Sequence, residues 1–300
     1  MPQELMPTST SNIINKINYS LKAPLRIDFA GGWTDVPHIM KGKKGFVSNA
    51  AIRPLVEYKA GKFNFSGYPR GSGLSTSTAA KLLEMLNSKT YNAEPKSLSN
   101  IGEDLFNLEN EELQWFIGRQ DQYAIVYGGF HCFEFGDDYA KPLDLDIDRD
   151  TLDTLRQKLL LLHTSESRNA QLAVEEVYKY HNTENGQRAI AELVICGREF
   201  ARALERKDFD ACAQIIDRNW EAQKLLAPSS TTEKLDAMYA FAKANGALGG
   251  KLCGAGGGGA FLFFANDVDQ LKKAMKQKFV DAFEIDFEFE YRSIKELNQF

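Results

Sequence analysis

Apolar residues recur along the chain with two different periods, and these periods predict where strands and helices lie. Leu25, Ile27 and Phe29 alternate with polar neighbours, which predicts a strand that ends at Gly31 and Gly32. Residues 45–68 read as two or three further short strands. The first part of the chain is therefore predicted to contain a sheet.

A helical period begins after this sheet. Ala79, Leu82, Leu83 and Leu86 fall at i, i+3, i+4 and i+7, which predicts a helix over about 75–88 with one apolar face. A second helix is predicted over about 98–116. Strands are predicted at 128–135 and at 158–164, where the run KLLLLHT is apolar throughout.

The second half of the chain is predominantly helical. Four helical segments are predicted between about 166 and 245, followed by a glycine-rich loop, a strand over 260–265 and a helix over 267–279. Alternating Phe283, Ile285, Phe287, Phe289 and Tyr291 predict one final strand. Because strands and helices do not alternate regularly, we expect an α+β protein of two lobes. The expected parts are an arm over 1–20 and lobes over 21–155 and 156–300.

Composition narrows the possible partners. The 300 residues are 43% hydrophobic and 26% charged, with a net charge of −5 and no block of lysine and arginine, so we expect no nucleic-acid partner. No apolar run reaches the roughly 20 residues that span a bilayer, and the polar start lacks a signal core. The four cysteines are scattered, which favours reduced thiols. We therefore expect a cytoplasmic protein without membrane contact. The oligomeric state stays open.

The stretch PRGSGLSTSTAA, residues 69–80, is the first candidate for a ligand site. Gly71 and Gly73 are followed by Ser75, Thr76 and Ser77 at the start of the predicted helix. Free amides and the positive dipole end of a helix favour an anion there. A well-capped helix after a flexible loop is the simpler alternative.

Two other glycine-rich matches fail on context. GAGGGG, residues 254–259, fits G-x-G-x-x-G but precedes a strand, whereas a dinucleotide fingerprint follows a strand and opens a helix. GALGGKL, residues 246–252, is one residue short of a phosphate-binding loop and has Leu252 where a hydroxyl must stand. DLDIDRD, residues 144–150, lacks the ligands of a calcium loop and is read as a solvated strand edge with its apolar residues inward.

Several separate segments together supply what phosphoryl transfer requires. Arg26 and Asp35 flank the first pair of glycines, Glu109 lies on a predicted helix, and Asp121 follows twelve residues later. Phosphoryl transfer needs amides around the phosphates, oxygen ligands for magnesium, a cation to offset developing charge and a carboxylate that orients the attacking hydroxyl. Each residue taken alone also has an ordinary structural explanation, such as a surface charge or a helix face.

Three motifs in order resemble those of the GHMP small-molecule kinases. They are APLRIDFAGGWTD, PRGSGLSTSTA and GGKLCGAGGGGAFLFF, and the resemblance runs from about residue 21 to the C-terminus. Within that family the chain looks most like the sugar 1-kinases of the heptose 7-phosphate kinase and L-fucokinase type. The resemblance implies an N-terminal lobe like domain 2 of ribosomal protein S5 and a ferredoxin-like C-terminal lobe with added helices.

The resemblance also implies roles for individual residues. Asp121 corresponds to the catalytic aspartate and Arg26 to the arginine that steadies the transition state. Glu109 corresponds to the magnesium-binding glutamate, with Thr76 as hydroxyl ligand. The residues implied to wrap the phosphates of ATP are Gly71, Ser72, Gly73, Leu74, Ser75, Thr76 and Ser77. Those implied to line the sugar site are Trp33, Thr34, Asp35, Gly256, Gly257 and Gly258.

Departures from the family pattern shape the expected activity. Galactokinases carry Glu-His where this chain has Gly32-Trp33, which argues against galactose. Ser75 stands where glycine is usual, and only residues 36–70 separate Asp35 from Gly71, which shortens the part of the lobe that helps to hold adenine. We expect magnesium-dependent transfer from ATP to a sugar or sugar phosphate, at the anomeric hydroxyl. A non-catalytic sugar- or nucleotide-binding sensor is the alternative.

A phosphorylated acceptor would need additional cations near the site. The candidates from the sequence are Lys41, Lys43, Lys44 and Arg70. A solvated basic loop is the simpler role for the three lysines.

Overall fold

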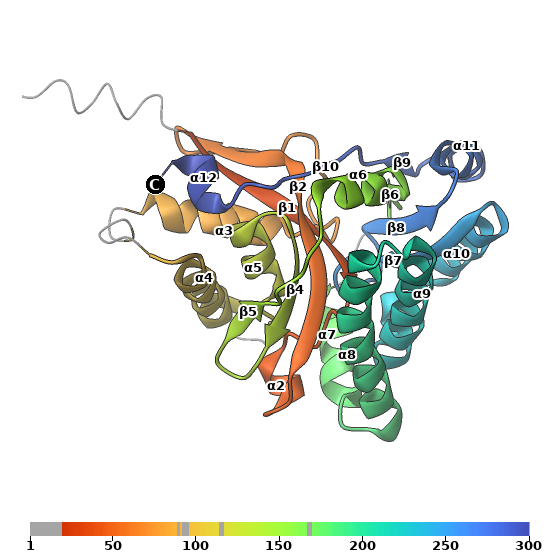
Figure 1. Ribbon diagram of the computed structural model, residues 1–300, viewed down its shortest axis with the longest axis horizontal. Coiled ribbons are helices and arrows are strands. Elements are labelled where there is room, and N and C mark those ends of the chain that lie inside the picture. Colours follow the sequence, from red (N-terminus) through yellow and green to blue (C-terminus); the bar gives the residue numbers. More distant parts are fainter. Residues whose placement is uncertain (1–19, 89–90, 92–95, 114–116, 167–169, 300) are drawn as a thin grey trace, which may run out of the picture.

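The computed structural model describes residues 20–88, 91, 96–113, 117–166 and 170–299, and the predicted N-terminal arm therefore lies almost wholly outside the described residues. Two sheets and the helices around them make up this part of the chain (Figure 1). None of the helices within these residues is long and apolar enough to cross a membrane. All four cysteines are free and buried.

The first sheet is antiparallel and has the order β1-β2-β4-β5, with β3 and β10 also paired to β2. Its strands are β1 (Ser20–Ala30), β2 (Gly45–Lys59), β3 (Lys62–Asn64), β4 (Phe130–Phe135), β5 (Ala140–Pro142) and β10 (Glu288–Phe289). The short helix α2 (Pro37–Met40) lies between β1 and β2, and α3 (Thr76–Asn87), α4 (Leu98–Leu113) and α5 (Gln120–Tyr127) follow β3. Helices α3 and α5 pack on β1 and β2, and α4 packs on α5.

The prediction of two or three short strands over residues 45–68 was wrong in detail, because β2 is one strand of 15 residues followed by the short β3. Pro54 would ordinarily end a strand, because it has no amide hydrogen to donate. Here it lies at an irregularity in the pairing with β1, where the register shifts between Ala23 and Leu25. At such a bulge the ladder tolerates proline and the strand continues.

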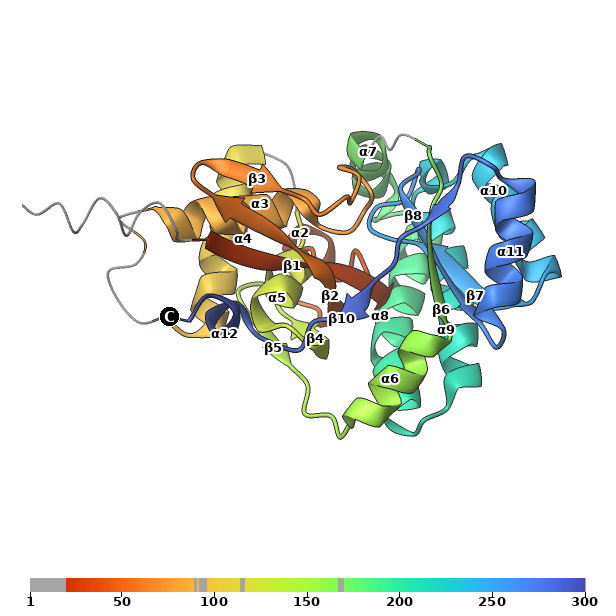
Figure 2. The ribbon, with the colours of Figure 1, turned by 90° about the horizontal axis from the view of Figure 1, so that it is seen from above.

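The second sheet is also antiparallel, with the order β7-β8-β6-β9. Its strands are β6 (Leu159–His163), β7 (Ala247–Leu252), β8 (Ala260–Ala265) and β9 (Phe283–Glu284). The helices of this half are α6 (Arg149–Gln157), α7 (Ala170–Tyr180), α8 (Glu184–Glu205), α9 (Phe209–Leu226), α10 (Glu233–Ala244) and α11 (Val268–Lys278). In Figure 2, α8 and α9 lie between the two sheets, while α10 and α11 cover the outer side of the second.

The apolar run at β6 is explained by burial on both faces of the second sheet. Leu159 and Leu161 belong to the main core, which extends through α8 and α9 into the first sheet. Leu160 and Leu162 belong instead to a second core beneath α10 and α11. Since successive strand residues point to opposite faces, a strand covered on both sides must be apolar at every position. This strand was predicted correctly.

The final predicted strand over 283–291 was wrong, because the chain crosses from one sheet to the other. Phe283 lies in β9 and pairs with β6, whereas Phe289 lies in β10 and pairs with β2. Helix α12 (Ile294–Asn298) then packs on β1 and α5. The alternation reflects burial along the whole segment, with Ile285, Phe287 and Phe289 all in the main core.

The segment 144–150, read as a strand edge, is not a strand. It runs without regular structure into α6, whose N-cap Asp148 accepts a hydrogen bond from the Thr151 amide. Leu143 and Leu145 nevertheless pack inward, as expected, against a small core cluster. The N-cap at Asp148 therefore starts a helix where a strand edge was predicted. The prediction that the apolar positions of this segment pack inward was correct.

Candidate active site

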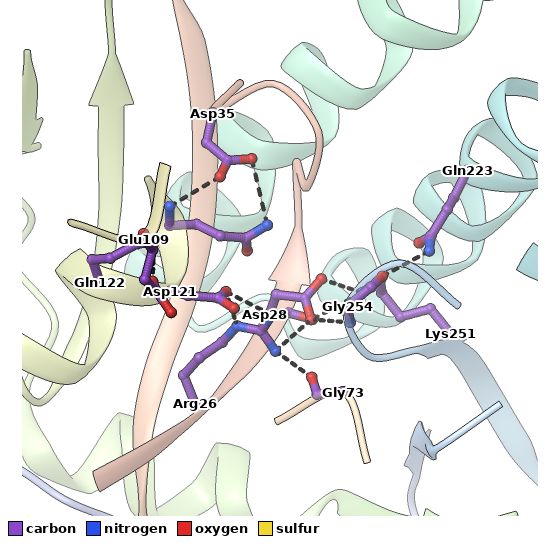
Figure 3. Close-up of polar contacts among 11 residues, drawn as sticks. Arg26, Asp28, Asp35, Gly73, Glu109, Asp121, Gln122, Gln223, Lys251 and Gly254 are labelled. Atoms are coloured by element: carbon purple, nitrogen blue, oxygen red, sulfur yellow. Dashed lines mark hydrogen bonds and ion pairs between the residues drawn. The ribbon is translucent and has the colours of Figure 1, made fainter. Parts of the chain in front are cut away.

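The carboxylate of Asp121 and the guanidinium of Arg26 form the centre of the candidate site (Figure 3). Arg26 comes from β1 and Asp121 from the first turn of α5. Nε and NH2 of Arg26 lie 2.8 and 2.7 Å from Oδ1 of Asp121. The arginine side chain is 4% exposed and the aspartate side chain 28%, so the cation is anchored in the protein while the carboxylate can be reached.

A buried chain of charges holds Arg26 from behind. NH1 of Arg26 lies 3.4 Å from Oδ1 of Asp28, and Asp28 also accepts a hydrogen bond of 2.9 Å from the Gly254 amide. Lys251, in β7 of the second sheet, is fully buried and forms an ion pair with Asp28. Burial alone would raise the pKa of Asp28, but Lys251 and Arg26 outweigh it and lower that pKa overall. This chain of charges links β1 to the glycine-rich loop.

The loop at 69–75 lies against Arg26 and leads into α3. NH1 of Arg26 donates to the carbonyl of Gly73, and the Arg26 amide donates to the Leu74 carbonyl. Ser75 is the N-cap of α3 with a left-handed φ of 64°, which explains why glycine is the usual residue at this position. Its hydroxyl is buried and has no hydrogen-bond partner among the described residues.

Two adjoining cavities meet at this centre. The first, which we call the Glu109 cavity, has a volume of about 310 Å³, and the second, the Arg70 cavity, about 480 Å³. Of the described residues, Arg26, Ser77 and Asp121 line both. A ligand in either cavity can therefore contact the Asp121 carboxylate.

The Arg70 cavity contains the loop and the start of α3. It is lined by Arg26, Phe63, Phe65, Arg70, Gly71, Gly73, Ser75, Thr76, Ser77, Ala80, Lys81, Glu84 and Asp121. First-turn amides of a helix have no acceptor within the helix, so those of α3 remain available to a ligand. Amides, hydroxyls and three cations make this cavity suited to a phosphate chain.

Glu109 lies on α4 and faces the first cavity. Its carboxylate accepts a hydrogen bond of 2.6 Å from Nε2 of Gln122. Burial raises the pKa of Glu109 to about 7; the bond from Gln122 opposes this shift, and the negative charge of Asp121 adds to it. A cation bound at this position would stabilise the ionised form of Glu109, which is buried and lies near a second acid.

The donor atoms fit magnesium rather than a softer metal. The described residues contain no group of three or more His, Cys, Asp and Glu that could hold a metal ion. Magnesium takes one or two carboxylates and completes its oxygen ligands from water and substrate phosphates. Glu109 supplies such a carboxylate. Of the hydroxyls at the start of α3, Ser77 lines the Glu109 cavity as well, while Thr76 lines only the Arg70 cavity.

Asp35 lies beside Asp121 in the Glu109 cavity. It accepts hydrogen bonds from the amide and the side chain of Gln120, at 2.9 and 3.4 Å. The pKa of Asp35 is raised to about 6, chiefly by burial. The hydrogen bond from the Gln120 amide opposes this shift, and the negative charge of Asp121 contributes to it. Gly118 is required here, because an added Cβ would lie 1.8 Å from Oδ2 of Asp35.

Of the remaining residues expected at the sugar site, only some line the Glu109 cavity. Trp33 lines the Glu109 cavity from a left-handed backbone conformation, with φ 76°. Thr34 is fully buried, and its hydroxyl bonds to the backbone of Gly31 and Phe46. Residues 256–258 line neither cavity; Gly254 and Ala255 line the first instead.

The glycine run supports the loop at 69–75 from behind. The Ala260 amide donates to the Ser72 carbonyl at 2.9 Å, and an added Cβ on Gly259 would lie 2.5 Å from that same oxygen. Ser72 is itself fully buried. The glycines therefore allow two backbone segments to approach closely.

Sequence reasoning missed four residues of this network. Asp28, Gln120, Gln122 and Lys251 all bond to an expected site residue or to each other. Asp28 and Lys251 lie inside quoted motifs, and a buried polar residue within an apolar strand is a signal that could have identified Asp28. The two glutamines gave no signal, because an amide side chain in a predicted helix is ordinary and does not indicate a ligand.

Comparisons with known proteins show which proteins the chain resembles in sequence. Residues 200–281 match the family model described as GHMP kinases C terminal. The chain is 28% identical over 234 residues to the D-glycero-alpha-D-manno-heptose 7-phosphate kinase of Campylobacter jejuni, covering 77% of this chain and 68% of that one. It is 24% identical over 346 residues to the bifunctional fucokinase/GDP-fucose pyrophosphorylase of Arabidopsis thaliana, covering 89% of this chain but only 31% of that relative.

The fold is shared with solved kinases. The crystal structure of a D-glycero-D-manno-heptose 1-phosphate kinase from Bacteroides thetaiotaomicron superposes with a TM-score of 0.65 at 20% identity, covering 91% of this chain and 97% of that one. These matches confirm the resemblance to the GHMP kinases and the predicted α+β fold. The chain is thus similar to the GHMP kinases in the sequence of residues 200–281 and in its fold.

Proposed function

We propose that the protein transfers the γ-phosphoryl group of ATP, with magnesium, to the anomeric hydroxyl of a sugar. The observation that carries the proposal is the Arg26–Asp121 pair, which lies where the phosphate-suited Arg70 cavity meets the Glu109 cavity. The similarity to kinases named for heptose phosphates and fucose supports a sugar as acceptor.

The chain's own residues account for the steps of transfer. Asp121 orients the sugar hydroxyl and receives its proton as the sugar oxygen bonds to the γ-phosphorus. The bond from that phosphorus to the bridging oxygen breaks, and ADP leaves. Arg26 offsets the negative charge that develops on the transferred group.

The start of α3 and Glu109 position the phosphates. The backbone of Gly71 to Ser77 offers amides to the phosphate oxygens. Glu109, with Thr76 or Ser77, would hold magnesium, which neutralises phosphate charge when bound. Trp33 and Asp35 would contact the acceptor from the walls of the Glu109 cavity.

Two aromatic residues of β3 and the turn after it suggest where adenine binds despite the short 36–70 segment. Phe63 and Phe65 line the Arg70 cavity, and the guanidinium of Arg70 lies 4.6 Å above the Phe65 ring. Aromatic faces bind bases by stacking, at about 1–3 kcal/mol per base. Replacing Phe65 by Leu should raise KM for ATP at least several-fold and leave KM for the sugar unchanged.

The test is to incubate the protein with ATP, magnesium and a panel of free and phosphorylated hexoses and heptoses, and to identify products by ³¹P NMR. A new sugar phosphate at the anomeric carbon, formed with one ADP per molecule, supports the proposal. The buried side chain of Ser75 in the Arg70 cavity favours the alternative of a sensor. A sensor would be stabilised against heat by a sugar or nucleotide and would form no product.

A further inference from the structure

Helix α9 is bonded to two segments of the Glu109 cavity through two amide side chains that lie one turn apart. Oδ1 of Asn219 accepts a hydrogen bond of 2.8 Å from the Gly31 amide. Nε2 of Gln223 donates to the Gly254 carbonyl at 2.9 Å (Figure 3). Residues four positions apart lie on the same face of a helix, so both side chains leave α9 on one face. A helix of the second half therefore holds a segment of each half.

Gly31 is the point at which the segment 31–35 is fixed. Its carbonyl accepts hydrogen bonds from the amide and the hydroxyl of Thr34, at 3.1 and 2.7 Å, and these bonds close the turn after β1. Its φ is 95°, and an added Cβ would lie 1.9 Å from the Phe46 carbonyl oxygen. One backbone polar group of Gly31 is thus bonded within the turn, and the other is bonded to Asn219.

The turn that begins at Gly31 carries side chains that line the Glu109 cavity. Gly32, Trp33 and Asp35 line it, whereas Asn219 is not among the described residues that do. Trp33 has a left-handed φ of 76°, a conformation that a residue with a side chain keeps only where its surroundings hold it. Asn219 therefore acts on this wall through the backbone and without contacting a ligand.

Both partners of the bond between Asn219 and Gly31 are buried. Asn219 is 1% exposed, and Gly31 is buried at the end of β1. Without the acceptor oxygen of Asn219, the Gly31 amide would be left buried and unsatisfied. Such a backbone group shifts toward another acceptor or toward water, and the turn shifts with it. A displacement of about 1 Å in groups that position a substrate costs up to about 100-fold in rate.

We propose that Asn219 is a positioning residue for the acceptor, because its bond to the Gly31 amide holds Trp33 and Asp35 in the wall of the Glu109 cavity. The inference rests on the proposed kinase function, in which Trp33 and Asp35 contact the acceptor. Gln223 supports another part of the same cavity, since Gly254 lines it and donates to Asp28. None of the described residues that line the Arg70 cavity belongs to the segment 31–35, so ATP binding is independent of Asn219.

The test measures KM for the acceptor and KM for ATP separately, with the sugar that the wild type phosphorylates fastest. Asn219→Leu keeps the approximate size of the side chain and removes the acceptor oxygen. KM for the acceptor should rise about tenfold or more, while KM for ATP stays unchanged. A purely structural role of Asn219 would instead lower the folded fraction, and with it kcat, and would leave both KM values unchanged.

Asn219→Asp is the conservative variant that tests the bond itself. A carboxyl oxygen accepts a hydrogen bond from the Gly31 amide whether or not the acid is protonated. KM for the acceptor should therefore stay close to the wild-type value in this variant. An equal rise of KM in the Asp and Leu variants would overturn the inference, because the bond to Gly31 would then not be what matters.

Asn245→Leu is the matched control, because Nδ2 of Asn245 also bonds to the backbone, at 2.8 Å from the Phe241 carbonyl, and the residue lines neither cavity. Both KM values should be unchanged in this variant. If Asn219→Leu does not fold, Thr34→Val decides the question, since it releases the same turn from the carbonyl of Gly31 and should also raise KM for the acceptor.

Two further outcomes separate this inference from the proposed function. An unchanged KM for the acceptor in folded Asn219→Leu, or in Thr34→Val where the first variant does not fold, overturns the inference and leaves the kinase function standing. Absence of turnover by the wild type with every sugar overturns both.

Discussion

The guanidinium of Arg26 contacts a single oxygen of Asp121 through two of its nitrogens, Nε at 2.8 Å and NH2 at 2.7 Å. One oxygen of the aspartate is thus held in place, and the carboxylate faces the point where the two cavities join. In the proposed mechanism, this arrangement places the proton acceptor for the sugar hydroxyl beside a fixed positive charge.

Arg26→Lys should lower kcat by about 100-fold or more while the protein stays folded. Lysine keeps the charge but has one point of contact in place of the planar fork, so it cannot hold Asp121 and the Gly73 carbonyl together. Steady-state kinetics would measure the loss. Arg149→Lys, at an exposed arginine over Tyr291, is the control and should retain full activity. Wild-type kcat in the Arg26 variant would remove Arg26 from the mechanism.

Lys251→Met should destabilise the protein by about 3–5 kcal/mol, because it leaves the carboxylate of Asp28 buried with less compensating charge. The double variant Asp28→Asn/Lys251→Met removes both charges and should recover much of that stability. Urea unfolding measures the free energy of each. If the single variant is as stable as the wild type, the buried ion pair between the two sheets is not maintained in solution.

Asp35 should make stability depend on pH. Its pKa is raised from 3.8 to about 6, chiefly by burial, so the folded state favours the protonated acid. The contribution of Asp35 to the free energy of unfolding is present in full below pH 3.8. It is lost as pH rises through 6, and the loss is up to about 3 kcal/mol. The free energy of unfolding of the wild type relative to Asp35→Asn should therefore fall between pH 4 and 7. A constant difference across this range would contradict the burial of the charge.

Gly118→Ala should raise KM for the acceptor at least tenfold and leave KM for ATP nearly unchanged. The added methyl would overlap Oδ2 of Asp35 and displace that carboxylate from the Glu109 cavity. Gly136→Ala is a suitable comparison, because an added Cβ there would also overlap a side chain, 2.2 Å from Tyr139, while Gly136 lines neither cavity. Equal KM values for the acceptor in both variants would show that Asp35 does not contact it.

The sequence was sufficient for the elements and motifs whose signals are local. The apolar stripe of α3, the buried strand β6 and the glycine-rich loops all follow from residue spacing. Motif resemblance also pointed to Arg26 and Asp121, which the fold brings together across 95 positions of sequence. That contact depends on the pairing of β1 within the sheet and the packing of α5 on it, which no local pattern encodes.

The parts that escaped prediction are decided by long-range contacts. Residues 283–291 alternate like one strand, but their hydrogen-bond partners lie in two different sheets. The role of Lys251 could not be read from its neighbours, because its counter-charge Asp28 lies 223 positions away. Likewise, the charge of each cavity depends on side chains from several elements and appears only when the fold assembles them.

The most direct test of the central claim is the rate of ATP-dependent sugar phosphorylation by Asp121→Asn. The amide keeps the size of the side chain but cannot accept the hydroxyl proton, so we predict a fall in kcat of about 10²- to 10⁴-fold with KM for ATP little changed. Asp138→Asn, at an exposed aspartate, should keep the wild-type rate. Wild-type turnover in the Asp121 variant would contradict the account.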